Sequence, residues 1–145
     1  MLLLAAAPLA ARDSLGVYDG WAAFRDASPA RCYAIAKAEG NSAVGAYATI
    51  STWPGKGVRG AVHIVLSHEV SPKATVRLAV GDKRFTLVTK GRNAWAADPR
   101  EDAAIIAAIR SAARMSVSGG GFTDRYTLTG AATAIDAATV GCAKR

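Results

Sequence analysis

Three side chains that follow one another carry the groups of nucleophilic catalysis. Ser67, His68 and Glu69 supply a hydroxyl, an imidazole and a carboxylate. Consecutive residues of a strand point to opposite faces of its sheet, so His68 is predicted to face away from Ser67. His63 and His68, five residues apart, are predicted on opposite faces for the same reason and cannot share a metal ion.

A second chemical signal is the glycine-rich segment 55–60, which reads G-K-G-V-R-G. This spacing matches a dinucleotide-binding loop, but such a loop must lie between a strand and a helix so that phosphate meets the helix N-terminus. Here the alternating apolar run 61–66 follows, which is typical of a strand. The segment is therefore predicted to connect two strands and to bind no cofactor.

The one adjacent acidic pair, Glu101 and Asp102, lies where the first turn of a helix is expected. Negative charge is favoured there by the helix dipole, which explains the pair without acid–base chemistry. No metal-ligand spacing and no nucleophile motif is found elsewhere in the sequence. The sequence therefore predicts a protein that is not an enzyme, with no catalytic residues and no metal site.

A cationic hairpin face is the most informative feature. Residues 76–80 and 83–88 flank Gly81 and Asp82, which suit a two-residue turn. That register pairs Val80 with Lys83, Leu78 with Phe85 and Val76 with Leu87. The outward face then carries four cations, Lys73, Arg77, Arg84 and Lys90. This face is interpreted either as ordinary solvated surface or as a docking surface for a polyanion.

Charge along the whole chain agrees with an anionic partner, because 18 basic and 11 acidic residues give a formal net charge of +7. Nucleic acid is not the predicted partner. An oligonucleotide platform needs aromatic rings interleaved with cations on one exposed face. Trp21, Tyr33, Trp95 and Tyr126 lie instead in strand-like runs, where core packing is expected.

The elements that must position these groups are mostly strands. Apolar and polar residues alternate with a period of two over 17–24, 31–38, 44–51, 61–67, 75–80, 84–89, 93–96, 114–118 and 125–129. Two helices are expected in the C-terminal half, one capped by Asp98 with Pro99 in its first turn and one over 131–140. This order predicts a mainly β fold, an antiparallel β-sandwich of the immunoglobulin-like class.

The apolar stretch 1–11 is similar to the hydrophobic part of a secretory signal peptide, which leaves 12–145 as a single domain. A positive n-region is missing, so an apolar N-terminal strand is the alternative. No apolar run reaches the roughly 18 residues of a transmembrane helix. In a secreted chain the two cysteines, Cys32 and Cys142, are predicted to form a disulfide; two buried free thiols are the alternative.

Several blocks, taken in order, resemble the invasion-associated locus B family of bacterial envelope proteins. They are Gly20-Trp21, R-C-Y-A at 31–34, N-A-W-A-A-D at 93–98, R-M-S-V-S-G at 114–119 and D-R-Y-T-L-T-G at 124–130, followed by an alanine-rich helix and Cys142. The similarity extends over about residues 16–142.

The resemblance implies a β-sandwich that is periplasmic, secreted or associated with the outer membrane, in a family whose named member aids bacterial entry into host cells. We therefore expect a non-catalytic envelope protein that binds or supports an envelope or host-surface component. The alternative is a small periplasmic hydrolase with an unrecognised site. A pocket that gathers Asp, Glu, His or Ser groups within hydrogen-bond reach would favour the hydrolase; an apolar groove or a flat basic face would favour binding.

Overall fold

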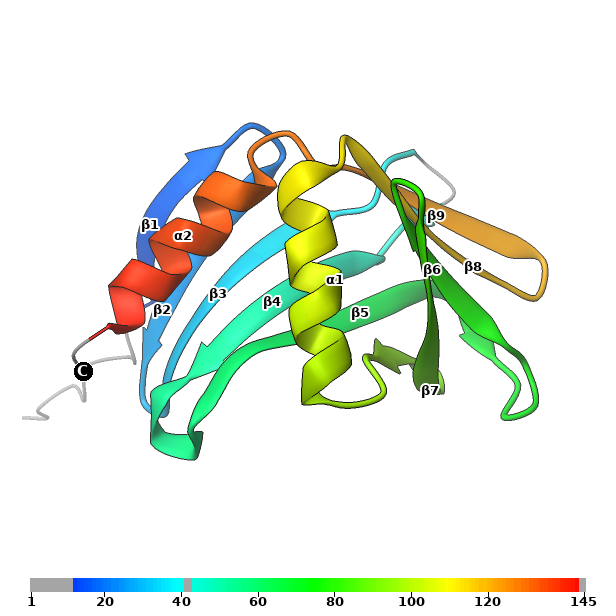
Figure 1. Ribbon diagram of the computed structural model, residues 1–145, viewed down its shortest axis with the longest axis horizontal. Helices are drawn as coiled ribbons and strands as arrows, with labels where there is room; N and C mark the ends of the chain where they lie inside the picture. Colours follow the sequence, from blue (N-terminus) through cyan, green and yellow to red (C-terminus); the bar gives the residue numbers. More distant parts are fainter. Residues whose placement is uncertain (1–11, 41–42, 144–145) are drawn as a thin grey trace, which may run out of the picture.

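The computed structural model describes residues 12–40 and 43–143, which form nine strands, two α-helices and a short 3-10 helix (Figure 1). The predicted signal peptide, 1–11, lies outside the described residues. The elements are β1 (Arg12–Tyr18), β2 (Trp21–Ala27), β3 (Ala30–Lys37), β4 (Tyr47–Trp53), η2 (Pro54–Lys56), β5 (Val58–Val70), β6 (Val76–Val80), β7 (Lys83–Trp95), α1 (Pro99–Ser111), β8 (Arg114–Gly119), β9 (Phe122–Thr127) and α2 (Ala131–Cys142).

All nine strands belong to one antiparallel sheet in the order β1-β2-β3-β4-β5-β7-β6-β8-β9. The 13-residue strand β7 connects its two halves, because its C-terminal part pairs with β5 and its N-terminal part pairs with β6. The sheet is strongly bent, and both helices lie on its concave side (Figure 1).

The prediction of a mainly β, antiparallel protein with two helices in its C-terminal half is thus confirmed. The immunoglobulin-like sandwich is not confirmed, because the strands are hydrogen-bonded into one continuous sheet. Periodicity also missed a turn. The predicted strand 17–24 is split at Asp19 and Gly20, where Asp19 has a φ of 56°. Conversely, the predicted strands 84–89 and 93–96 are both parts of β7.

Alanine lets α2 pack closely on the sheet. The sheet buries Ala23, Ala34, Ala36 and Ala48, and α2 buries Ala131, Ala134 and Ala138. Larger side chains then close the core around this contact. Trp21 is completely buried, and its indole Nε1–H donates to the Thr127 carbonyl at 2.9 Å, which joins β2 to β9.

Helix α1 begins as its sequence predicts. The Asp98 side chain accepts from the Glu101 backbone N–H at 2.8 Å, which satisfies one of the free donors of the first turn. Asp102 has a different role, since its Oδ1 accepts from the Val62 backbone N–H at 2.8 Å and ties the helix to β5. Burial raises the pKa of Asp102, and the bond from Val62 opposes this shift. The carboxylates of Asp98 and Asp102 therefore each accept a backbone hydrogen bond that positions the helix.

The disulfide predicted from the two cysteines is confirmed. Cys32 on β3 and Cys142 at the end of α2 are joined with an S–S distance of 1.99 Å and a Cα–Cα distance of 5.8 Å. Both residues are buried. The bond therefore fixes the C-terminal end of α2 on the sheet.

Candidate functional site

The side chains of Ser67 and His68 lie within hydrogen-bond distance of each other, and Ser67 also contacts an acid from another strand. The Oγ of Ser67 lies 2.9 Å from Nδ1 of His68 and 2.5 Å from Oδ1 of Asp124 on β9. The prediction that His68 faces away from Ser67 is therefore wrong. Its physical reason is a shift of register between Val65 and Val70 of β5, which breaks the strict alternation that the prediction assumed.

The order of these groups is not that of a catalytic triad. In a triad the imidazole lies between the acid and the nucleophile, where it takes the hydroxyl proton. Here the Ser67 hydroxyl donates to Asp124, so Nδ1 of His68 is left to donate to the same hydroxyl. Asp124 is 2% exposed and also accepts from the Ser67 backbone N–H at 2.9 Å. These hydrogen bonds therefore join β9 to β5.

Tyr126 shares the inner face of β9 with Asp124. Its side chain is buried, and its hydroxyl has no hydrogen-bond partner among the described residues. Burial raises the pKa of Tyr126, and the nearby Asp124 carboxylate raises it further. The phenol therefore stays neutral and keeps its proton at ordinary pH.

The register of the cationic hairpin is confirmed. Val80 pairs with Lys83, Leu78 with Phe85 and Val76 with Leu87. Val76 and Leu78 are buried, whereas the four cations predicted for the outward face, Lys73, Arg77, Arg84 and Lys90, are all exposed. Lys73 lies in the connection before β6, and Lys90 lies far along β7, so Arg77 and Arg84 form the centre of this face.

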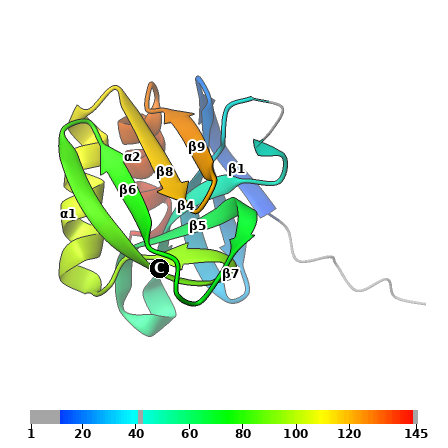
Figure 2. The same cartoon turned by 90° about the vertical axis from the view of Figure 1, so that its right-hand side faces the viewer.

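The sheet extends this surface beyond the hairpin. Across the strands, Arg84 is opposite Ala79, Ala79 is opposite Ser116, and Ser116 is opposite Arg125 of β9. In the next row Arg77 is opposite Ser118. We use "cationic face" for Lys73, Arg77, Arg84, Lys90 and Arg125. Figure 2 views the molecule from the side on which β6, β8 and β9 lie.

Within residues 12–40 and 43–143, Arg77, Arg84 and Arg125 have no carboxylate within ion-pair distance. On β8, Ser116 is next to Arg125 and Ser118 is next to Arg77. The Arg84 guanidinium donates to the carbonyls of Gly81 and Lys83 at 3.1 and 3.2 Å. Sequence reasoning missed Arg125 because the neighbour of β6 on the sheet, β8, follows it only after β7 and α1. No residue near Arg125 in the sequence indicates that β9 lies two strands away from β6 in the sheet.

Another row of cations lies against aromatic rings at the other end of the sheet. The guanidinium carbon of Arg31 lies 4.1 Å from the ring centre of Tyr33 and 5.0 Å from that of Trp53. The ammonium of Lys56 lies 4.6 Å from the Trp53 ring. Because the protein's own cations lie over these rings, the rings are not free to stack with bases as in an oligonucleotide platform.

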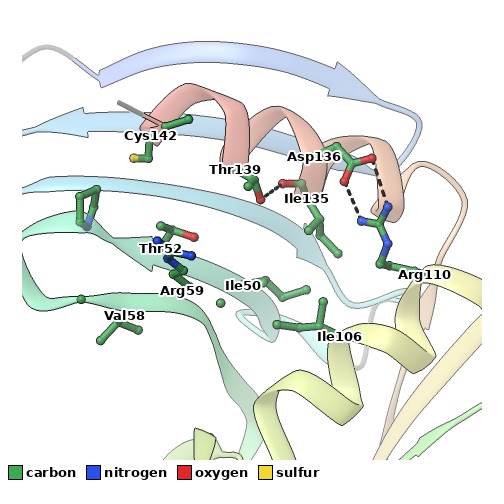
Figure 3. Close-up of a pocket in the computed structure, with 14 residues that line it drawn as sticks. Ile50, Thr52, Val58, Arg59, Ile106, Arg110, Ile135, Asp136, Thr139 and Cys142 are labelled. Atoms are coloured by element: carbon green, nitrogen blue, oxygen red, sulfur yellow. Dashed lines mark hydrogen bonds and ion pairs between the residues drawn. The ribbon is translucent and has the colours of Figure 1, made fainter. Parts of the chain in front are cut away.

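A pocket of about 810 Å³ lies between the two helices and strands β4 and β5 (Figure 3). Its apolar wall is formed by Ile50, Val58, Ile106 and Ile135. Its polar groups come from Thr52, Arg59 and Thr139 and from the ion pair of Arg110 with Asp136. This size lies within the range of about 300–1,000 Å³ that is usual for small-molecule sites.

The glycine-rich segment forms one rim of this pocket. As predicted, it connects two strands, since η2 leads into β5. Gly60 has a φ of 75° and lies at a shift of register, so Arg59 is paired with Thr52 across β4 and both residues line the pocket. A Cβ atom on Gly60 would lie 2.7 Å from the Ile106 side chain. Glycine is therefore needed here for backbone conformation and for space.

The polar groups of the pocket suit binding better than catalysis. Its described lining contains one carboxylate, Asp136, and lacks serine and histidine. Arg110 donates to both Asp136 oxygens, at 2.7 and 3.2 Å, and these hydrogen bonds lower the pKa of Asp136. A carboxylate held in this state is a poor general acid.

Comparisons of the chain with protein-family models, with curated proteins and with solved structures give no match. In the part of the chain that the structure describes, no three His, Cys, Asp or Glu side chains are grouped closely enough to hold a metal ion. Neither α1 nor α2 has the length and apolar character needed to cross a bilayer, and no other helix of the described ranges does.

Proposed function

We propose that this chain is a non-catalytic protein of the bacterial envelope, periplasmic or secreted, which binds an anionic envelope or host-surface component through the cationic face. The observation that carries the proposal is a set of three exposed arginines without carboxylate partners among the described residues. Arg84 and Arg125 lie in one row across the sheet, and Arg77 lies in the next row. The disulfide is compatible with an oxidising compartment. The resemblance to invasion-associated locus B proteins supports the same location.

The chemistry of the face favours phosphate or carboxylate groups. A guanidinium presents a planar fork of donors that binds either group through two hydrogen bonds. Ser116, next to Arg125, and Ser118, next to Arg77, add hydroxyl donors. Lipopolysaccharide and acidic glycans carry such groups in repeated array. Because the cations are exposed, binding should weaken as salt is added.

The alternative, a small periplasmic hydrolase, has less support. Among the described residues, Ser67, His68 and Asp124 form a group with the necessary types, but the imidazole does not lie between the carboxylate and the hydroxyl as it does in a triad. The pocket between the helices has an apolar wall, and its Asp136 carboxylate is already paired with Arg110. Both features favour binding.

Reversal of two charges on the face is expected to abolish most of the binding. The Arg77→Glu/Arg84→Glu variant should bind lipopolysaccharide at least about tenfold more weakly than the parent at low salt, because local cation fields raise association by about 10- to 1,000-fold. The measurement is calorimetric titration at low and at physiological ionic strength. The matched control, Lys37→Glu/Arg100→Glu, has the same net charge from exposed positions elsewhere. Equal binding by the two variants would leave the face as ordinary solvated surface.

Processing gives a separate test of location. The mature protein is expected to begin near Ala11 or Arg12 and to be recovered in the periplasmic fraction, because 1–11 resembles a signal peptide. N-terminal sequencing of the fractionated protein measures this directly. An intact Met1 on a cytoplasmic product would contradict the envelope location.

A further inference from the structure

We infer that the pocket between α1, α2 and the sheet is a second binding site, which takes a single-chain lipid with an anionic headgroup. It is distinct from the cationic face, and its residues come from β4, η2, β5 and the two helices. The inference therefore does not depend on the ligand proposed for the cationic face.

The wall of the pocket fits a hydrocarbon chain. Ile50 on β4 and Ile135 on α2 are buried, and Ile106 and Val58 are partly buried (Figure 3). An apolar hollow open to water is unfavourable until an apolar group displaces that water. A volume of about 810 Å³ suits one small ligand rather than a patch of bilayer.

The cations that line the pocket favour a ligand with an anionic headgroup. The lining holds two cations and one carboxylate, and Arg110 is already bound to Asp136. Arg59 has no ion-pair partner within the described ranges, and its strand neighbour Thr52 adds a hydroxyl on the same side. Figure 3 shows the Arg59 side chain beside Thr52. A carboxylate or phosphate with one apolar chain complements this arrangement.

The pocket is also held open before any ligand binds. The disulfide fixes the end of α2 near Cys142, and the ion pair of Arg110 with Asp136 joins α1 to α2 at the other end. Cys142, Arg110 and Asp136 all line the pocket. A preformed site loses less conformational freedom on binding, which favours measurable affinity for a small ligand.

The test uses the full chain and two probes that share a twelve-carbon chain, dodecanoate and dodecyl maltoside, both kept below their micelle concentrations. Calorimetric titration is expected to show dodecanoate binding at least about tenfold tighter than the neutral probe, the effect of one charge-assisted contact. Arg59→Gln should remove most of that preference. Arg100→Gln, which removes an exposed cation outside the pocket, should retain it.

Filling the pocket gives the second arm. Thr139 is exposed on α2 and lines the pocket, so Thr139→Trp places an indole in the hollow without replacing a buried residue. Dodecanoate binding should fall at least tenfold. Val140→Trp on the same helix, at a 74% exposed position outside the lining, should bind like the parent.

Three results would overturn the inference. They are no binding of dodecanoate by the parent chain, equal affinity for the two probes, and undiminished binding by a folded Thr139→Trp variant. Failure of the cationic-face variant to alter lipopolysaccharide binding would leave this inference intact, since Arg77 and Arg84 do not line the pocket.

Discussion

Replacement of Cys142 by alanine is expected to lower the free energy of unfolding by about 2–5 kcal/mol, the usual loss for a native disulfide in a small secreted domain. The bond joins residues 110 positions apart, so it restricts a large part of the unfolded chain. It also holds the end of α2, whose buried residues are mostly alanines and contribute little burial each. Urea unfolding followed by circular dichroism measures the difference.

The pair of cysteines supplies its own control. Cys32→Ala removes the same bond from the other end and should cost a similar free energy, and the double variant should cost little more than either single change. Thiol labelling of the denatured, unreduced parent should find no reactive group. Two reactive thiols in that experiment would show that the bond is not formed in the protein.

Removal of the Asp124 carboxylate is expected to cost about 2–3 kcal/mol, because Asp124→Ala leaves donors of Ser67 without their acceptor in a largely buried place. Asp124→Asn should cost less than about 1 kcal/mol. Its amide oxygen can accept from the Ser67 N–H and its amide nitrogen can donate to the hydroxyl. Chemical denaturation of the two variants and the parent gives both numbers.

The same pair of variants tests the hydrolase alternative. If Asp124 serves the structure alone, Asp124→Asn should show the binding properties of the parent together with nearly its stability. A hydrolytic activity present in the parent and lost in a stable Asp124→Asn variant would make the Ser67 group catalytic and would contradict the proposed function.

Features set by neighbouring residues could be predicted from the sequence. The turn at Gly81 and Asp82 fixed the pairing of β6 with β7, and the cap at Asp98 located the start of α1. Both depend on contacts within a few residues, where local backbone preferences decide the outcome. The disulfide could be predicted for a different reason, since two cysteines allow one pairing.

Features that join distant segments could not be predicted in this way. Ser67 meets Asp124 across 57 positions, and that contact depends on a register shift in β5 that leaves no trace in the apolar pattern. The pocket likewise needs Arg59, Ile106 and Ile135 from three elements whose mutual placement is set by packing. The arrangement of the strands could not be predicted either, because alternation alone is the same in one bent sheet and in two stacked sheets.

The continuous strand β7 joins the two parts of the sheet that carry the two proposed binding sites, the cationic face and the pocket. Its N-terminal part carries the outward arginine rows with β6, and its C-terminal part pairs with β5, which contributes to the pocket. Both helices lie on the concave side of the sheet (Figure 1). A molecule attached to an anionic surface through the cationic face would therefore keep its pocket off the contact area. Small ligands could then enter and leave the pocket while the protein stays bound to that surface.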